Sequence, residues 1–205
     1  MRTYKKLLST LLCFVLSLFL MSCGLNSNKS SNLSPKAGET VSSFFNSIKA
    51  GDFDKASNYL DKSNKEYNTD LKFKNSFEEK LVKTAVSKVS YKILSSQANS
   101  NNAVVEVEIT SPDLLNIYND VMSNIITPII PEYSSANESE KQKIKSKAVK
   151  AAVEYITKTL NSEGCPKTTN TAKLTLYEQN SKWIIKPNED FIYALTGKMP
   201  QLLRK

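Results

Sequence analysis

The chain has 205 residues and a mass of 22.9 kDa, enough for one ordinary domain and a short additional segment. A hydrophobic fraction of 40%, with five Gly and seven Pro, indicates a buried core and excludes a collagen-like or low-complexity protein. The sequence contains no His, which excludes the Ser-His-Asp triad, the HExxH zinc site and the two-histidine iron site. Three Cys are too few for a disulfide scaffold. We therefore expect neither a metal nor a cofactor.

The N-terminus has the pattern of an export signal. A basic start, MRTYKK, precedes an apolar run from Leu7 to Met21, which is shorter than the roughly 20 apolar residues of a membrane span. The run ends in LMSC, followed by Gly, and this motif resembles the lipobox of bacterial lipoproteins. The resemblance implies that residues 1–22 are removed as a signal peptide. It also implies that the Cys23 thiol carries a diacylglyceryl group, alongside acyl chains such as palmitate, because a thiolate is nucleophilic enough to form a stable thioether.

An uncleaved N-terminal anchor helix remains the alternative, and both readings place the domain on the extracytoplasmic face of the cell membrane. Loss of the three basic residues of the signal lowers the formal net charge from +8 to +5. Cys165 is then the only free thiol, so the exported chain does not depend on disulfides. The basic residues are nearly all Lys, and Asn and Ile are abundant, which indicates an AT-rich genome and a Gram-positive host.

Residues 23–36 are rich in Ser and Asn and predict a flexible tether, followed by a single domain over 37–205. Two helices are expected first, separated by Gly51, with Asp52 as the N-cap of the second. Their predicted inward-facing residues include Val41, Phe44, Phe45 and Ile48 in the first helix and Phe53, Ala56, Tyr59 and Leu60 in the second. A third helix is expected to open at Ser76, where Ser-Phe-Glu-Glu has the pattern of a capping box.

Apolar and polar residues then alternate in two places, and this alternation predicts two antiparallel hairpins. The first hairpin surrounds the turn QANSNN and the second surrounds EQNSK, after which Asn188 caps a last helix that ends at Gly197. Residues 111–165 between the hairpins predict a helical insertion of two helices. We expect the first to begin at Ser111-Pro112 and to be broken at Pro128 and Pro131, and the second to begin at Ser135.

These elements predict an α+β domain, with the N-terminal helices packed on an antiparallel sheet of about four strands. The segment FFNSIKAGDFDKASNYLD and the later LTLYEQNSKWIIKP resemble the nuclear transport factor 2-like, or cystatin-like, domains of bacterial lipoproteins. That resemblance covers about residues 38–110 and 170–197. It implies that a helix wraps into a strongly curved sheet to form a cone, while the insertion over 111–165 departs from the family pattern.

The function expected first is a non-enzymatic, membrane-anchored module that binds a small ligand or a cell-envelope protein. A concave apolar face is the usual place for a ligand, and Tyr91, Trp183, Tyr177 and Phe53 are the predicted lining residues. Large aromatic side chains are more often core residues than ligand contacts, so packing is the competing explanation for all four.

An isomerase or dehydratase is a less favoured function, because the sequence shows no identifiable acid–base pair. Among the strand carboxylates, Glu106 and Glu108 share the spacing of exposed residues, and no His exists to activate Cys165 as a nucleophile. A third hypothesis is a structural or protein-interaction role, in which exposed Ile residues of the insertion (Ile125, Ile126, Ile129, Ile130) form a docking surface.

The row of Lys residues over 141–150 has two readings, a contact with anionic lipids or wall polymers and a solvated helix face, of which the second is favoured. Nucleic-acid binding is not expected, because Arg is almost absent and export removes the usual partners.

Overall fold

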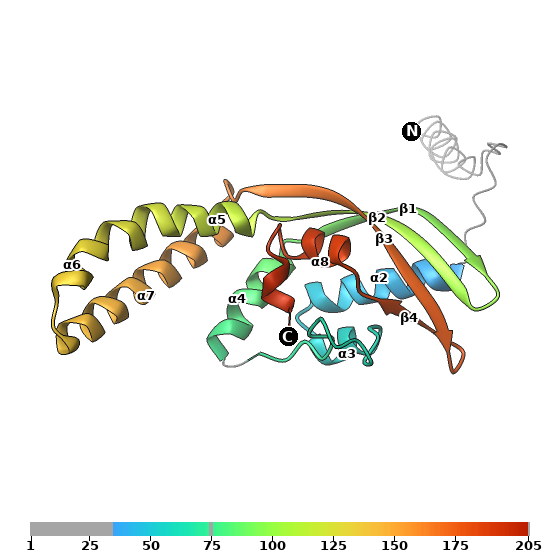
Figure 1. Cartoon of the computed structure of the whole chain (residues 1–205). Helices are drawn as coiled ribbons and strands as arrows, with labels where there is room; N and C mark the ends of the chain where they lie inside the picture. The colour runs from blue at the N-terminus through green and yellow to red at the C-terminus, as the bar shows by residue number, and fades with distance from the viewer. Residues whose placement is uncertain (1–34, 74–75, 205) are drawn as a thin grey trace, which may run out of the picture. The chain divides into compact units, whose positions relative to one another are not determined.

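The computed structural model describes residues 35–73 and 76–204 (Figure 1). The predicted signal peptide and Cys23 lie outside the described residues. Within the described part of the chain, no helix is both long enough and apolar enough to cross a bilayer.

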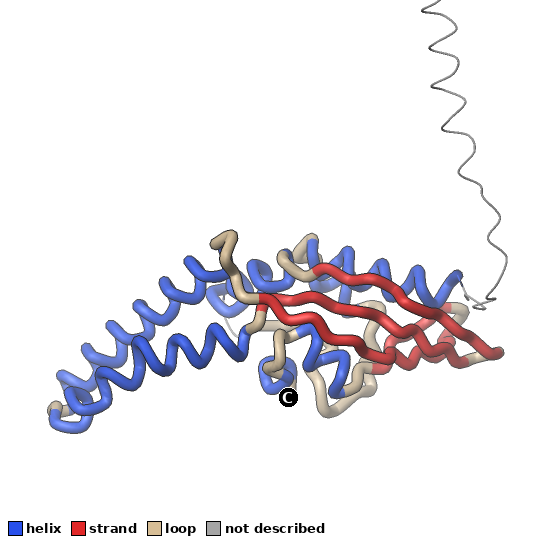
Figure 2. The backbone as a smooth tube through the Cα atoms, turned by 90° about the horizontal axis from the view of Figure 1, so that it is seen from above, coloured by secondary structure: helices blue, strands red, loops and turns tan. Residues whose placement is uncertain are grey.

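A four-stranded antiparallel sheet forms the centre of the domain (Figures 1 and 2). Its strands follow one another in space as they do in sequence, and the sheet is open rather than closed into a barrel. The strands are β1 (Ser90–Asn99), β2 (Asn102–Pro112), β3 (Lys167–Gln179) and β4 (Lys182–Lys186). The expected α+β class with two hairpins around a helical insertion is therefore confirmed.

Helices α2 (Pro35–Lys49), α3 (Phe53–Ser57), α4 (Ser76–Ser87) and α8 (Glu189–Leu195) lie near the sheet, followed by a 3₁₀ turn, η3 (Pro200–Leu203). The insertion forms two antiparallel helical limbs that project from the end of the sheet (Figure 1), and we call residues 114–161 the arm. Its outgoing limb consists of α5 (Leu114–Val121), a π-helical turn η1 (Met122–Ile126), a 3₁₀ turn η2 (Thr127–Ile129) and α6 (Ile130–Ser135). Its returning limb is α7 (Glu138–Asn161).

The concave face of the sheet is filled with side chains. One face of α2 supplies Val41, Phe44, Phe45 and Ile48, all at most 1% exposed, and these meet inward residues of β2 and β3 that are also buried. Phe191 of α8 closes the group, with its ring 5.6 Å from that of Phe44 in an edge-to-face arrangement. The space that the cone was expected to offer a ligand is thus occupied by the core.

The opposite face of the sheet is polar and partly exposed. Glu106 and Glu108 lie on this face, as their spacing predicted, and both are half-buried. Glu106 stands opposite Lys173 of β3, and Glu108 stands opposite Lys92 of β1. Opposite charges on neighbouring strands stabilise such a face.

Several local predictions are confirmed by the backbone. Gly51 ends α2 with φ +72°, in the left-handed region that glycine adopts without steric cost. Asp52 caps α3 by accepting a hydrogen bond from the Lys55 N–H, and Asn188 caps α8 by accepting one from the Phe191 N–H. Of the residues expected to face inward from this helix, Phe53, Ala56 and Leu60 are buried and Tyr59 is partly buried, although α3 itself ends at Ser57, before Tyr59 and Leu60.

Both hairpin turns are tighter than expected. The strands continue into the predicted loops, so that Asn99 pairs with Asn102 in the first hairpin and Gln179 pairs with Lys182 in the second. In the second turn, Asn180 and Ser181 both have positive φ, which is the conformation of a two-residue turn that follows the twist of its strands. Polar residues near a turn can still pair as strand residues. The polar composition of these segments therefore predicted longer loops than the structure has.

The predicted helix starts in the insertion were wrong. Ser111 and Pro112 belong to β2, and the Ser111 hydroxyl donates to the Ala194 carbonyl, so Asp113 is the cap of α5 instead. The second long helix begins after Asn137, which forms a reciprocal capping box with Glu140 in place of the expected Ser135. In each case an Asp or Asn two residues further on takes the N-cap position.

Pro128 and Pro131 do not interrupt the outgoing limb of the arm as expected. Both lie in the first turn of their short helices, where a missing N–H costs no hydrogen bond. The π-helical turn over Met122–Ile126 widens the backbone immediately before them. The limb therefore stays helical through both prolines.

Candidate functional site

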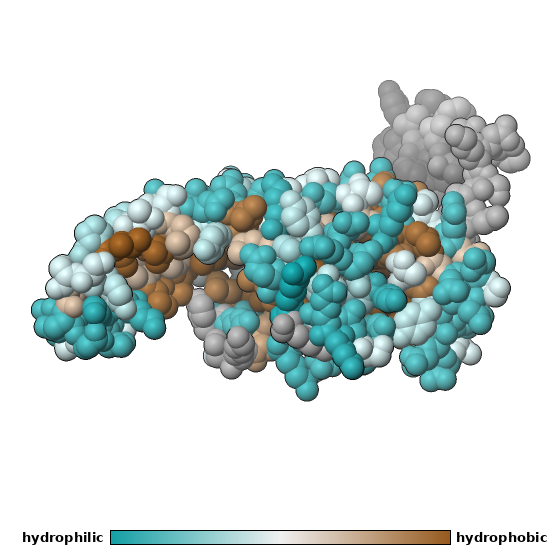
Figure 3. Space-filling model, viewed as in Figure 1, coloured by the Kyte–Doolittle hydropathy of each residue, from teal (hydrophilic) through white to brown (hydrophobic). Residues whose placement is uncertain are grey.

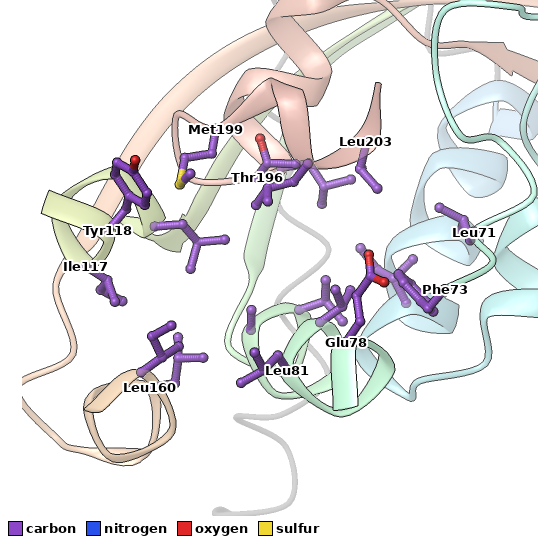
Figure 4. Close-up of a pocket in the computed structure, with 18 of the residues that line it drawn as sticks. Leu71, Phe73, Glu78, Leu81, Ile117, Tyr118, Leu160, Thr196, Met199 and Leu203 are labelled. Carbon is purple, nitrogen blue, oxygen red and sulfur yellow. The ribbon is translucent and has the colours of Figure 1, made fainter. Parts of the chain in front are cut away.

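An apolar pocket of about 290 Å³ lies where the arm joins the domain (Figure 4). Helix α4 forms one wall, the roots of α5 and α7 form another, and α8 with η3 covers the pocket from the sheet side. Nearly all of its lining side chains are aliphatic or aromatic; they include Leu81 and Ala85 of α4, Ile117 and Tyr118 of α5, Ile156 and Leu160 of α7, and Met199. We call this site the apolar pocket.

The inner wall of the apolar pocket belongs to a second, smaller core. Ala85, Ile117, Leu160 and Cys165 are buried together, separate from the main core under the sheet. Because these side chains come from α4 and from both limbs of the arm, the packing that fixes the arm also shapes the pocket. Figure 4 shows Leu81 and Leu160 on facing sides of the space.

Polar contacts at the root of the arm hold this geometry. The Asp113 carboxylate caps α5 by accepting from the Asn116 N–H, and its second oxygen accepts from Lys198 Nζ at 2.6 Å. The hydrogen bond to Asp113 raises the pKa of Lys198 above its ordinary value. Gly197, with φ +55°, allows the segment after α8 to lie against the end of β2, because a Cβ at this position would lie 1.9 Å from the Pro112 carbonyl oxygen.

The rim of the apolar pocket exposes hydrophobic side chains to solvent. Tyr118 is 46% exposed and Leu202 is 49% exposed, and both line the pocket. Val149 of α7 is 54% exposed and lies seven residues before Ile156, which places it further out along the same side of the helix. Figure 3 shows apolar surface along one side of the arm. Exposed apolar groups beside a pocket are typical of binding sites.

A second, polar cleft of about 380 Å³ adjoins the apolar pocket. The two sites share Phe53, Leu71 and Phe73, and the rings of Phe53 and Phe73 meet edge to face at 4.9 Å. The charged residues of this polar cleft are Asp52, Asp54, Lys72, Glu79 and Lys83. Lys83 pairs with Glu79 at 2.8 Å, so the polar cleft is partly neutralised by its own residues.

Of the four predicted ligand residues, Phe53 lines the apolar pocket and the other three lie elsewhere. Tyr91 stacks on Phe45 at a centroid distance of 4.5 Å, and Trp183 packs against the main core. The four are not brought together around one space, so their shared binding role stays a prediction. The aromatic residues singled out in the sequence include Tyr91 and Trp183, which pack against the main core. The apolar pocket, in contrast, is lined mainly by aliphatic residues.

Tyr177 takes part in a polar contact at the edge of the sheet. It hydrogen-bonds to Asp61, whose backbone N–H donates to the Ile185 carbonyl and so attaches the segment after α3 to β4. Burial raises the pKa of Tyr177, and the negative charge of Asp61 adds to this effect. Burial alone would raise the pKa of Asp61, but hydrogen bonds from Ser63 and Tyr177 outweigh it and lower that pKa.

The structure offers no support for catalysis at Cys165. The thiol is buried, and burial raises its pKa despite the nearby charges of Lys167 and Lys88. Among the described residues, no three His, Cys, Asp or Glu side chains gather closely enough to hold a metal ion.

The arm residues considered for docking are partly accessible. Ile130 is 51% exposed, while Ile125, Ile126 and Ile129 are half-buried, and the docking hypothesis stays a prediction. Lys143, Lys145, Lys147 and Lys150 of the lysine row are exposed, whereas Lys141 is half-buried and pairs with Glu138.

No protein-family model matches the sequence, and neither the curated proteins nor the solved structures include a significant match. The resemblance to nuclear transport factor 2-like domains therefore stays a prediction.

Sequence reasoning missed the apolar pocket because its wall combines α4, the arm and the segment after Gly197. These segments are far apart in the sequence, so their contact in the folded chain cannot be inferred from sequence patterns. One signal was present: the spacing of Val149, Val153, Ile156 and Leu160 marks an apolar stripe on α7.

Proposed function

We propose that this chain is a lipid-anchored, extracytoplasmic binding module that holds a small apolar molecule in the apolar pocket, without catalysing a reaction. The anchor rests on the sequence pattern around Cys23. The binding role rests on one observation: a pocket of about 290 Å³ whose lining is almost wholly apolar and whose rim exposes Tyr118 and Leu202.

The size of the apolar pocket sets the size of its ligand. An apolar protein cavity of about 150 Å³ holds one benzene molecule. A pocket of about 290 Å³ therefore has room for about a dozen carbon atoms. Each buried CH₂ group contributes about 0.8 kcal/mol, so affinity should increase with chain length until the pocket is full.

A binding role fits the chemistry of the apolar pocket better than an enzymatic one. Among the residues that the structure describes, the lining contains one carboxylate, Glu78, and two hydroxyl groups, on Tyr118 and Thr196. The Thr196 hydroxyl already donates to the Ile192 carbonyl at 2.6 Å. Acid–base catalysis needs two positioned groups with matched pKa values, and the described lining supplies no such pair.

Photolabelling with an uncharged probe tests this function. The full chain is reconstituted in phosphatidylcholine vesicles and irradiated with decanol that carries a diazirine on its alkyl chain, and labelled peptides are mapped by mass spectrometry. We expect the label on α4 and α7. Leu81→Trp, which fills the pocket, should reduce this labelling at least fivefold.

The matched control is Lys80→Trp, which places the same indole on the exposed side of the same helix. It should label like the unsubstituted chain. Equal labelling of all three chains, or label spread over the exposed surface without preference for the pocket walls, would show that the apolar pocket does not bind the probe.

A further inference from the structure

The returning limb of the arm carries a row of lysine residues that the apolar pocket does not use. Residues 141–150 of α7 include five Lys and no Asp or Glu. Lys143, Lys147 and Lys150 follow one another at intervals of four and three residues, so they lie on one face of the helix. All three are exposed, and the buried Ala148 lies on another side of the helix. We call Lys143, Lys147 and Lys150 the lysine face.

None of the described residues forms an ion pair with the lysine face. The residues outside the described ranges contain no Asp or Glu, so every acidic side chain of the sequence belongs to the described part. Lys141, at the start of the same row, differs in this respect, because it pairs with Glu138. The positive charge of the lysine face is therefore not neutralised by a carboxylate side chain of its own chain.

The spacing of the lysine face is unfavourable for an isolated helix. Like charges four residues apart repel each other, as on Lys143 and Lys147. The helix dipole gives no compensation, because it favours cations in the last turn and the lysine face lies in the first half of α7. Lys favours helix formation, but alternation with Glu would do so without repulsion. The arrangement thus suits an anionic partner outside the chain better than it suits helix stability.

Apolar side chains beside the lysine face favour a lipid bilayer over a soluble polyanion as that partner. Val149, next to Lys150, is 54% exposed, and Ile130 and Tyr133 near the tip of the arm are exposed as well. Figure 3 shows hydrophilic and apolar surface side by side on the arm. The surface of an anionic bilayer accepts cationic and apolar groups together, whereas a soluble polyanion offers charge alone.

We propose that the lysine face docks on the anionic phospholipid headgroups of the membrane surface and lays the arm along the bilayer. The proposal rests on the membrane location proposed above, and it does not require a ligand in the apolar pocket. Each lysine held at an anionic bilayer surface raises the binding constant about fivefold, so the three together contribute about 100-fold.

Residue-resolved acetylation tests the proposal on the unsubstituted full chain. The chain is reconstituted in vesicles of phosphatidylcholine alone, or with about 30% phosphatidylglycerol, and treated briefly with a membrane-impermeant acetylating reagent. We expect acetylation of the lysine face to be roughly threefold or more lower in the anionic vesicles. Exposed Lys182 of β4 is the internal control and should change little. About 1 M NaCl, which shortens the screening length to about 3 Å, should abolish the protection.

A photoreactive phospholipid distinguishes the bilayer from a soluble polyanion. Phosphatidylcholine with a diazirine on one acyl chain, present as a minor component, should label residues 143–150 in the anionic vesicles and not in phosphatidylcholine alone. Soluble polyphosphate, added to the phosphatidylcholine vesicles, provides the comparison. If polyphosphate protects the lysine face as well as the anionic vesicles do, and the phospholipid does not label these residues, the partner is a soluble polyanion and bilayer docking is overturned.

Substitution assigns the contact to the lysine face. Lys143→Gln combined with Lys147→Gln should raise acetylation of Lys150 in the anionic vesicles to about its value in phosphatidylcholine. The matched control, Lys182→Gln combined with Lys186→Gln, makes the same charge change on two exposed residues of β4 and should leave Lys150 protected. Because the four substituted positions are exposed, both variants should fold, which circular dichroism checks. Persistent protection of Lys150 in the first variant overturns the role given to the lysine face.

The outcomes separate this proposal from the proposed function. Equal acetylation of the lysine face in both lipid mixtures, or a fall that Lys182 shares, overturns the docking and leaves binding in the apolar pocket to be judged by the decanol probe. A chain that does not sediment with phosphatidylcholine vesicles contradicts the proposed anchor. The reactivity of its lysine face with added anionic vesicles still decides the docking.

Discussion

Lys198 Nζ lies 2.6 Å from Asp113 Oδ2, and this ion pair joins the end of α8 to the root of the arm. The Asp113 carboxylate is 11% exposed and also caps α5 through its other oxygen. One side chain thus fixes both the start of the arm and its attachment to the segment after α8, and residues of both line the apolar pocket.

Removing the Asp113 carboxylate should destabilise the domain by an amount that depends on the replacement. Asp113→Ala loses both the cap and the ion pair, and we expect it to lower the free energy of unfolding by about 1–3 kcal/mol. Asp113→Asn keeps an oxygen for the cap and should cost less. Urea unfolding of the three chains measures the difference, and equal stability of the alanine variant would contradict this role.

The same pair predicts a dependence of stability on alkaline pH. Because the hydrogen bond to Asp113 raises the pKa of Lys198 in the folded chain, its contribution is fully present below the ordinary lysine value of 10.5. It is lost as the pH rises through the raised value. The stability difference between the unsubstituted chain and Asp113→Asn should be constant from pH 7 to pH 10 and narrow above pH 10.5. A stability difference between the two chains that stays the same above pH 10.5 would contradict a stabilising ion pair.

Gly197 should not tolerate a side chain. A Cβ at this position would lie 1.9 Å from the Pro112 carbonyl oxygen, and φ is +55°. We expect Gly197→Ala to cost more than about 2 kcal/mol, because strain and a backbone collision combine. Gly164→Ala is the control: its Cβ would meet no atom within 4 Å, and its effect should stay within about 0.5 kcal/mol. Thermal unfolding measures the loss of stability in both variants, and an equal loss in the two would contradict the prediction.

Tyr177 should contribute to stability through Asp61. Because hydrogen bonds lower the pKa of Asp61, its contribution is present above the ordinary value of 3.8 and is lost as the pH falls through the lowered value. Tyr177→Phe should lower the free energy of unfolding by about 1 kcal/mol at pH 7, and this difference from the unsubstituted chain should become smaller in acid. Tyr91→Phe is the comparison. The contacts of the Tyr91 hydroxyl with described residues are long, 3.4 and 3.5 Å, so its loss should lower the free energy of unfolding by less.

The anchor predicted at Cys23 is tested by Cys23→Ser. A lipidated chain should fractionate with membranes and show the mass of an acylated N-terminal cysteine, and the serine variant should lack that modification. Two acyl chains anchor a protein stably on a bilayer, so the presence or absence of the modification decides the prediction. An unmodified chain that retains residues 1–22 in both forms would favour the uncleaved anchor helix.

Much of the fold could be predicted because it is encoded locally. The spacing of Val41, Phe44, Phe45 and Ile48 marks the buried face of α2, and the alternation around Val105 and Val107 marks a strand with one face in the core. Caps such as Asp52 and Asn188 were predictable because the acceptor lies three residues from its donor.

The site could not be predicted in the same way, because its parts meet only in the folded chain. Leu81, Ile117 and Leu160 come from three helices that are far apart in the sequence. Their apolar character gave each helix a buried side, without indicating that a space would remain between them. The aromatic residues that the sequence favoured for a ligand include Tyr91, whose ring is stacked against Phe45.

The crystal structure of the chain with bound decanol tests the central claim most directly, because this ligand has no charge and examines the apolar pocket alone. We predict the alkyl chain between α4 and the arm, in contact with Leu81 and Leu160, with its hydroxyl at the rim near Tyr118. An empty apolar pocket, with the alkyl chain bound elsewhere or not at all, would contradict the account.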